Sequence, residues 1–263
     1  MNKLINIDSS VLLTEEDIAF TEKVIKCGET EGPKFDSISI LMDEIPIFLV
    51  SNITMKKLED IEKKERNSEK PITNIVDYLG LYTRNFNILD TDIRAIAICP
   101  ERIIRCCDAD KRPVLTAKVI IHELAHLKMD MHPDADYGYM DDFFRWMEEP
   151  LANLITLQYF DNFVKNTCFK YKSFSNFSEK DNNGVLEFVK SFIEGQPENY
   201  KLANELFKYE SLKNSWDEWR KNKKSLSIGY IKEKTAYLNY VKENKTIDES
   251  FIIDKLKGLG FNL

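Results

Sequence analysis

The sequence predicts an α+β fold, in which a small mixed β-sheet with its helices is followed by a helical C-terminal half. Residues 93–98 alternate isoleucine with smaller or charged residues, a period of two that is typical of a half-buried strand. From residue 185 onwards, apolar residues recur at helical spacing to the end of the chain. With 263 residues, 43% of them hydrophobic and 31% charged, the chain can bury a substantial core in one large domain or two small ones.

The first ninety residues predict a helix, then one or two strands, then a charged segment. Thr14 precedes three acidic residues, which predicts a helix over residues 14–27 that ends near Gly28. Residues 37–52 are rich in isoleucine, leucine, phenylalanine and valine, and predict one or two strands joined by a turn. Residues 54–69 carry many charges and few apolar side chains, so we expect a solvated helix or a mobile excursion there.

Two prolines punctuate the next part of the chain. Pro100 ends the strand at residues 93–98, and residues 101–107 predict a short helix. Pro113 fits the first turn of a long helix that follows. The middle of the chain therefore reads as a strand, a short helix and a long helix.

The remaining chain predicts a loop over residues 134–142 and a long apolar helix over residues 143–163. Residues 166–184 are polar and rich in serine and asparagine, which favours a boundary. We therefore divide the chain into a first domain at residues 1–165, a linker at residues 166–184 and a helical C-terminal subdomain at residues 185–263, packed on the first.

The long helix carries the motif His-Glu-Leu-Ala-His at residues 122–126, inside an apolar run without glycine or proline. Histidines four residues apart lie on one face of a helix, so His122 and His126 can bind one metal ion. Glu123 lies beside that ion and can take a proton from a zinc-activated water. The alternative is a helix whose two histidines are merely capped or solvated, and the apolar run that leads into the motif favours the metal site.

A catalytic zinc ion takes three protein ligands, and the first candidate for the third is Glu149. It lies at the start of the next strong helix, and Asn153 follows one turn later, where an amide can orient a metal-bound imidazole. Pro150 puts Glu149 at or before the first helical turn, which leaves its direction open, and Glu148 is the neighbour that could replace it. Both glutamates could also simply favour a helix N-terminus.

These patterns resemble a family of known enzymes. Residues 119–126 resemble the zinc helix of the zincin metallopeptidases, and residues 149–153 resemble the E-x-x-A-N and E-x-x-x-D patterns of the gluzincin type, including small intracellular bacterial or phage-associated peptidases. The resemblance implies that residues 1–165 are a zincin-like metallopeptidase domain. It also implies that residues 93–98 are an edge strand along which a peptide or protein substrate binds. An interior strand is the alternative.

His132 is the second candidate for the third ligand. The spacing of His122, His126 and His132 matches the H-E-x-x-H-x-x-G-x-x-H pattern of metzincins, but Met129 stands where those proteins have glycine. Methionine does not readily adopt the positive φ of that turn. We therefore prefer Glu149 and keep Glu148 and His132 as alternative ligands.

The function that follows is zinc-dependent hydrolysis of peptide bonds, with Zn²⁺ as cofactor and Glu123 as general base. A second donor is needed for the oxyanion of the tetrahedral intermediate. The candidates are His132, Tyr137, Tyr139, Arg145 and Tyr200. One rival is a non-enzymatic zinc-binding interaction protein with a zincin-like fold, which the intact Glu123 disfavours. Another is an amidase acting on a small molecule.

Composition limits the partners and the compartment. The net charge of −7 disfavours a nucleic-acid-binding surface. No window approaches the roughly 18 uninterrupted apolar residues of a membrane-spanning helix. The five cysteines include no C-x-x-C pair, so we expect free thiols, neither a disulfide framework nor a zinc ribbon, and a cytoplasmic location.

Overall fold

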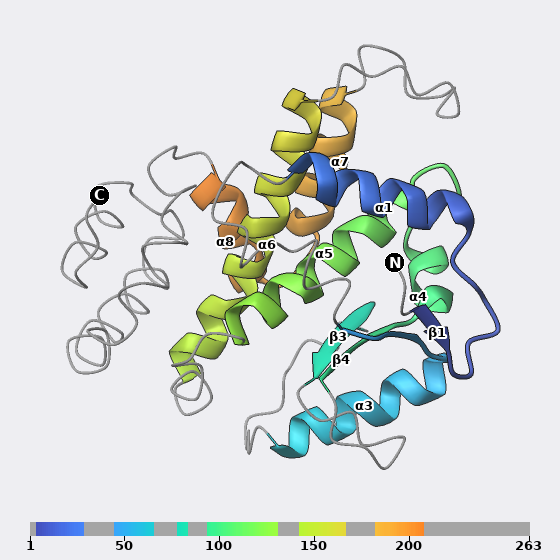
Figure 1. The fold of residues 1–263 in the computed structure, drawn as a ribbon. Coiled ribbons are helices and arrows are strands. Elements are labelled where there is room, and N and C mark those ends of the chain that lie inside the picture. The colour runs from blue at the N-terminus through green and yellow to red at the C-terminus, as the bar shows by residue number, and fades with distance from the viewer. Residues whose placement is uncertain are drawn as a thin grey trace.

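The fold is α+β, with a small four-stranded mixed sheet covered by helices (Figure 1). The computed structural model describes residues 4–28, 45–65, 78–83, 94–130, 142–166 and 182–207. The elements within these ranges are β1 (Leu4–Asn6), α1 (Glu15–Gly28), β2 (Ile47–Leu49), α3 (Asn52–Glu65), β3 (Gly80–Thr83), β4 (Ala95–Ile98), α4 (Pro100–Cys106), α5 (Arg112–Asp130), α6 (Asp142–Asn166), α7 (Asn182–Glu194) and α8 (Glu198–Phe207).

The strands run in the order β1-β2-β4-β3. β1, β2 and β4 pair in parallel, and β3 pairs antiparallel with β4. β2 and β4 fall within the predicted strand segments, whereas β1 and β3 were not predicted. The antiparallel β3 is an edge strand within the described part of the chain.

The expectation that residues 93–98 form an edge strand is wrong. β4 lies between β2 and β3, so its backbone groups pair on both sides. All four of its residues have no solvent exposure. The strand is therefore fully buried rather than half-buried, and it has no free edge to offer to a peptide.

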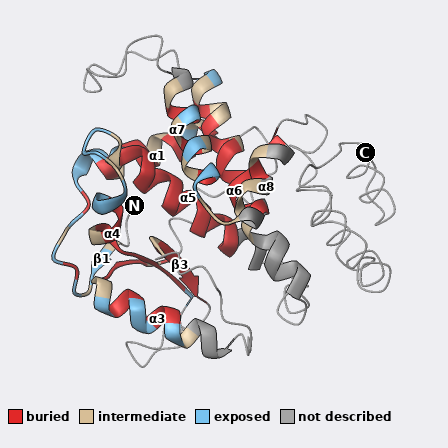
Figure 2. Ribbon diagram, turned by 180° about the vertical axis from the view of Figure 1, so that it is seen from behind, coloured by how far each residue is buried: buried red, intermediate tan, exposed pale blue. Residues whose placement is uncertain are grey.

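The sheet separates two apolar cores, because alternate strand residues face opposite sides. Ile96 and Ile98 belong to a large core shared with α1, α5, α6 and α7. Ala95 and Ala97 belong to a smaller core that α3 completes with Met55. The ribbon views show the sheet between α5 and α3 (Figures 1 and 2).

α3 corrects the expectation for residues 54–69, since the described part of this segment is neither mobile nor solvated all round. One side of α3 is buried against the sheet and the other is exposed (Figure 2). Its buried side includes Met55, Leu58 and the charged Glu59. The helix therefore covers one face of the sheet despite its many charges.

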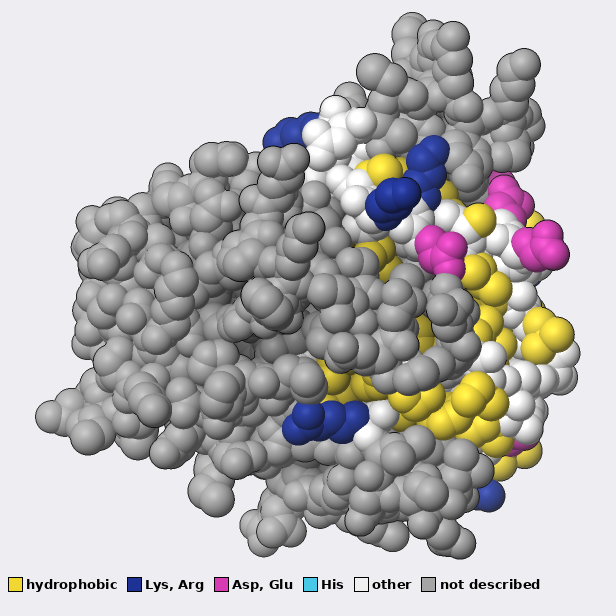
Figure 3. All heavy atoms as spheres, viewed as in Figure 1, with side chains coloured by type: hydrophobic (Ala, Val, Ile, Leu, Met, Phe, Trp, Pro, Cys, Tyr) yellow, Lys and Arg dark blue, Asp and Glu magenta, His cyan; other side chains and the backbone are white. Residues whose placement is uncertain are grey.

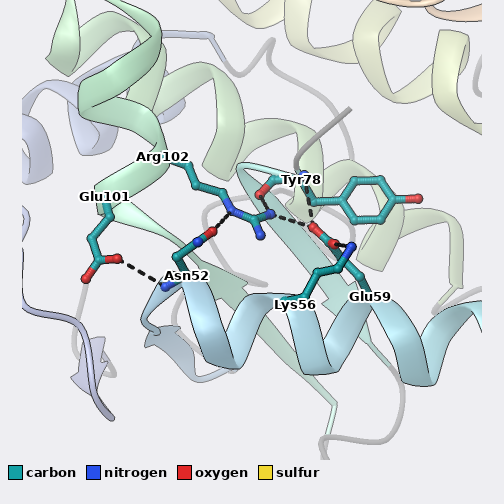
Figure 4. A network of polar contacts seen from close by, with 6 residues as sticks. All are labelled: Asn52, Lys56, Glu59, Tyr78, Glu101 and Arg102. Atoms are coloured by element: carbon teal, nitrogen blue, oxygen red, sulfur yellow. Dashed lines mark hydrogen bonds and ion pairs between the residues drawn. The ribbon is translucent and has the colours of Figure 1, made fainter. Parts of the chain in front are cut away.

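Glu59 takes part in a buried polar network that joins α3, α4 and the start of β3 (Figure 4). The Arg102 guanidinium donates to the Glu59 carboxylate, to Asn52 Oδ1 and to the carbonyl oxygen of Tyr78. The Tyr78 N–H donates to Glu59 Oε1 at 3.2 Å, the same oxygen that accepts from Arg102. Buried charges require such partners, and here they fix the segment that leads into β3.

The predicted helices at residues 14–27, 101–107 and 143–163 are present as α1, α4 and α6, and Pro113 lies in the first turn of α5. Thr14 caps α1: its Oγ1 accepts the Asp17 N–H at 3.2 Å, and the Asp17 carboxylate accepts the Thr14 N–H at 2.7 Å. Asp17 is fully buried and also binds Arg112 at the start of α5, at 2.7 Å. α1 and α5 are therefore joined by charge as well as by packing.

α7 and α8 are the described part of the predicted helical C-terminal half. Val189 and Ile193 of α7, and Phe207 of α8, lie in the same core as α5 and α6. The predicted loop at residues 134–142 and most of the predicted linker lie outside the described residues, so the division into domains stays a prediction. None of the helices that the structure describes is long and apolar enough to cross a membrane.

Hydrophobic side chains gather on one part of the surface, over the region that holds α4 and β1 (Figure 3). Within the described ranges, the large hydrophobic residues with substantial exposure are Ile5 of β1, Leu12, Ile53 of α3 and Ile104 of α4. These exposed residues belong to β1, the segment that follows it, α3 and α4. The histidine pair, in contrast, is buried in α5.

Candidate metal centre

Three metal-binding side chains converge between α5 and α6. His122 and His126 lie one turn apart on α5, and Glu149 reaches them from α6. The distance between the two histidine Nε2 atoms is 3.2 Å. Glu149 Oε2 lies 3.2 Å from His122 Nε2 and 3.4 Å from His126 Nε2. The three donor atoms therefore form a nearly equilateral triangle.

This triangle has the size that a tetrahedral zinc site requires. Ligand atoms about 2.0–2.1 Å from a zinc ion, at tetrahedral angles, lie about 3.3–3.4 Å from one another. The observed separations are 3.2–3.4 Å. Hydrogen bonds alone explain the triangle poorly, because a neutral imidazole offers a single N–H proton and three edges need bridging. The donor set thus fits zinc, with the fourth position open.

The protonation states of two donors favour a metal as well. Burial lowers the pKa of His122 to about 3, and the positive charge of Lys118 acts in the same direction. Burial opposes ionisation of Glu149, but the charge of His126 and hydrogen bonds from both histidines hold its pKa well below the usual value. A neutral imidazole and an ionised carboxylate are the forms that bind a metal ion.

Two buried polar atoms beside the triangle have no hydrogen-bond partner among the described residues, His122 Nδ1 and Asn153 Oδ1. Asn153 is fully buried on α6, four residues after Glu149, and its Nδ2 donates to Gln196 Oε1 at 3.2 Å. An imidazole that binds metal through Nε2 carries its proton on Nδ1 and needs an acceptor there. Asn153 Oδ1 is an acceptor of the kind that this proton needs, but the structure shows no hydrogen bond between the two atoms, so the role of Asn153 stays a prediction.

Glu123 lies in the site on the side of β3. Its Oε2 accepts the N–H of Tyr82 at 2.8 Å. Gly80 makes this close approach of β3 to α5 possible, because a Cβ there would lie 2.7 Å from Val119 Cγ1 and 2.9 Å from Glu123 Cγ. Burial raises the pKa of Glu123 to about 7, with a further contribution from Glu149, against the opposing effects of His126, Tyr82 and Lys118.

Lys118 adds a positive charge to the same buried region. It lies on α5 one turn before His122, is 3% exposed, and holds its ammonium 5.5 Å from the ring centroid of Phe192 on α7. Burial lowers its pKa to about 8, although Glu123 and Glu149 oppose the shift. The charge of Lys118 thus acts on both carboxylates of the site.

Tyr200 is the one candidate oxyanion donor whose side chain the structure describes. Its ring stacks on His122, with the ring centroids 6.4 Å apart and an interplanar angle of 21°. His132, Tyr137 and Tyr139 lie outside the described residues. The side chains of Arg145 and of Glu148 on α6 also lie outside the description.

The expectation that Pro150 keeps Glu149 at or before the first helical turn is wrong. α6 begins at Asp142, so Glu149 lies two turns inside it, and Pro150 is an interior residue. Proline costs a helix one backbone hydrogen bond and strains the preceding turn. Here the helix continues through Asn166 because its buried face packs against α1, α5 and α8.

Sequence reasoning missed Lys118, Gly80 and Tyr82. A lone lysine within the apolar run Val114–Ile121 was the available signal for Lys118. Gly80 and Tyr82 gave no comparable signal, because their contacts with Glu123 come from the pairing and placement of β3. Comparison with known proteins adds no further residue: no family model matches this chain, and no curated protein or solved structure matches it either.

Proposed function

We propose that this chain is a zinc-dependent metallopeptidase of the zincin type, with Zn²⁺ held by His122, His126 and Glu149. The observation that carries the proposal is the triangle of donor atoms, 3.2–3.4 Å on each side, with a buried carboxylate directly beside it. A purely structural zinc site has no use for Glu123, and such sites usually have four protein ligands. Three protein ligands with a neighbouring general base, here Glu123, are the arrangement that zinc hydrolases use.

Zinc in such a site would act as a Lewis acid, which polarises a carbonyl group and makes a bound water more acidic. Glu123 takes the proton of the attacking water and delivers it to the leaving amine. A pKa of about 7 suits both transfers at neutral pH. The Tyr82 N–H holds Glu123 Oε2, so Oε1 carries the proton. Tyr200 is our choice as the donor to the oxyanion, because it lies against His122.

An extended substrate would bind along β3, the edge strand next to α5. The Leu79 carbonyl accepts the Cys99 N–H, so by the alternation of an antiparallel ladder Leu81 and Thr83 pair with β4. The backbone groups of Gly80 and Tyr82 then face away from β4. The Tyr82 N–H is bound to Glu123, so the side of β3 that a peptide would follow is the side that faces the site. We therefore propose β3, and not residues 93–98, as the strand along which a substrate binds.

The cytoplasm remains the compartment we propose, because no disulfide joins the described cysteines Cys27, Cys99, Cys106 and Cys107. Disulfides are rare in a reducing compartment, and this chain shows none among its described cysteines.

The first test is zinc content, measured in the purified protein and in the variants His122→Ala and Glu149→Ala. We expect one zinc ion per chain, lost in both variants and retained in Glu187→Ala, an exposed carboxylate on α7. Zinc retained in Glu149→Ala would move the third ligand to Glu148 or His132. A protein that takes up no zinc on reconstitution would refute the proposal.

The second test is hydrolysis of a peptide library by the zinc-loaded protein. Glu123→Gln should bind zinc as the wild type does but lose at least about a hundredfold in kcat/KM, since it cannot accept the proton. A wild-type protein that binds zinc but cleaves no peptide would favour a non-enzymatic zinc-binding protein.

A further inference from the structure

We propose that Lys118 binds a carboxylate of the substrate, so that this site selects a substrate with a carboxylate close to the scissile bond. This inference rests on the proposed function and names the substrate class of the same site. It starts from three properties of Lys118: its place on α5, its lack of a polar partner, and the charge of the site around it.

The place of Lys118 follows from the helix. Lys118, His122 and His126 are spaced by four residues, so the lysine shares a face of α5 with the metal ligands. Its charge acts on His122, Glu123 and Glu149, which puts the ammonium in the surroundings of the donor triangle. The residue is only 3% exposed, so most of its side chain lies in the interior of the protein.

The ammonium has no hydrogen bond or ion pair to any residue in the part of the chain that the structure describes. The ammonium lies over the face of the Phe192 ring, 5.5 Å from its centroid. An ammonium has three N–H donors, and a cation–π contact leaves them without acceptors. Two buried charged groups elsewhere in the described residues have ion pairs, Arg102 with Glu59 and Asp17 with Arg112. Lys118 has no such pair in the described part of the chain.

The carboxylates of the site do not account for Lys118. With both histidines neutral, Glu123 and Glu149 together balance the two positive charges of a zinc ion. The ammonium then leaves the buried, zinc-loaded site with a net positive charge, which is costly in a medium of low dielectric constant. An anionic group from the substrate removes this excess and supplies the missing acceptors. A carboxylate is the anionic group that peptides carry.

Binding of dicarboxylates tests the proposal without any turnover. Succinate and glutarate offer one carboxylate to zinc and a second to Lys118, whereas their mono-amides, succinamate and glutaramate, lack the second charge. We expect the zinc-loaded wild-type protein to bind at least one dicarboxylate about tenfold or more tightly than the matched mono-amide, measured by titration calorimetry. Equal affinities in both pairs would overturn the proposal.

Two variants test whether Lys118 causes the preference for the dicarboxylate. Lys118→Met should abolish the preference for the dicarboxylate while it keeps zinc content at the wild-type level. Lys111→Met is the matched control, because Lys111 also lies over a phenylalanine of α7, Phe188, at 6.0 Å, but is 41% exposed. A preference that survives in Lys118→Met would overturn the proposal. The comparison of ligands on the wild-type protein needs no variant and stands even if Lys118→Met fails to fold.

Peptides distinguish the source of the carboxylate. Peptides with a free C-terminus are compared with their C-terminal amides, and peptides with Asp or Glu beside the cleaved bond with their Asn or Gln counterparts. A preference of about tenfold in kcat/KM in the first pair assigns a C-terminal carboxylate, and in the second an acidic side chain. Cleavage without either preference would overturn the proposal. If no peptide is cleaved, the proposed function fails, while the calorimetry still decides the role of Lys118.

Discussion

Glu123 shows how a single carboxylate is prepared for proton transfer. Burial and the negative charge of Glu149 disfavour the charged form of Glu123, while the charge of His126, the Tyr82 N–H and the Lys118 ammonium favour it. The balance places its pKa at about 7 instead of 4.5. A glutamate with this environment both accepts and releases a proton at neutral pH, which an exposed glutamate does not do.

The raised pKa of Glu123 predicts a loss of stability with rising pH in the zinc-free protein. Between pH 4.5, the ordinary pKa of glutamate, and about pH 7, the folded state holds a proton that the unfolded state has released. Raising the pH through this window therefore destabilises the fold, by about 2 kcal/mol from this group. Urea unfolding at pH 5 and at pH 8, in the presence of a chelator, measures this difference in unfolding free energy.

Glu123→Gln is the control, because it has no proton to lose and should lack this part of the pH dependence. The remaining pH dependence, which comes from other groups, is common to both proteins. Equal differences in unfolding free energy between pH 5 and pH 8 for the wild type and the variant would contradict the prediction.

At the scale of elements, the site depends on the contact between β3 and α5. β3 donates the backbone N–H of Tyr82 to the carboxylate of Glu123, and Gly80 allows the close approach. The network of Glu59, Arg102 and Tyr78 fixes the start of the same strand from the opposite layer (Figure 4). β3 is thus held from both of its faces, one by a structural ion pair and the other by the site.

Gly80→Ala should damage catalysis while it leaves zinc binding intact. The added Cβ would meet Val119 and Glu123 at distances under 3 Å, which forces β3 away from α5. We expect a loss of about 1–3 kcal/mol in unfolding free energy and a lower kcat, with unchanged zinc content. Gly195→Ala is the control, since its nearest atom lies at 3.4 Å. A Gly80→Ala enzyme with wild-type stability and activity would rule out this role.

Arg102→Met should be strongly destabilising, because it removes the buried guanidinium that pairs with Glu59 and leaves this carboxylate only the Tyr78 N–H and the partly exposed Lys56. We expect a loss of about 3–5 kcal/mol. Lys111→Met breaks an exposed ion pair with Asp108 and should cost less than about 1 kcal/mol. Urea unfolding of the two variants gives both values, and similar losses in the two would show that burial of the Glu59 pair is not what matters.

Local sequence signals predicted the helices and the histidine pair, because capping residues, prolines and a four-residue spacing act within one turn. They did not predict β1 or β3, which have three and four residues and are stabilised by neighbours far away in the sequence. They left residues 93–98 open between an edge strand, which the zincin resemblance implied, and an interior strand, because alternation within a strand does not reveal how many strands flank it. The contacts of Glu123 with Gly80 and Tyr82 were not predicted either, because they depend on the pairing of β3 with β4.

At the scale of the whole molecule, the three proposed metal ligands come from the two helices that share the main core with α1. A bound ion would join α5 to α6 directly, in addition to their packing. Occupancy of the site and stability of the fold are therefore linked, since the unfolded chain does not hold the three donors in place.

Removal of zinc should lower the melting temperature. Free zinc at a hundred times its Kd adds about 2.7 kcal/mol to the unfolding free energy, and a chelator should remove this contribution. His122→Ala should show the same Tm with and without zinc. A Tm of the wild type that does not respond to zinc would contradict the link between the site and the fold.

The division of the donors between α5 and α6 also has a consequence for synthesis of the chain. The ribosome makes His122 and His126 first and must add 23 more residues before Glu149 exists. At about 5–20 residues per second this takes roughly one to five seconds. During that interval the nascent polypeptide offers an ion two imidazoles and no carboxylate from α6. Tight capture of the metal is therefore a late event in biogenesis, completed only when α6 has emerged and docked on α5.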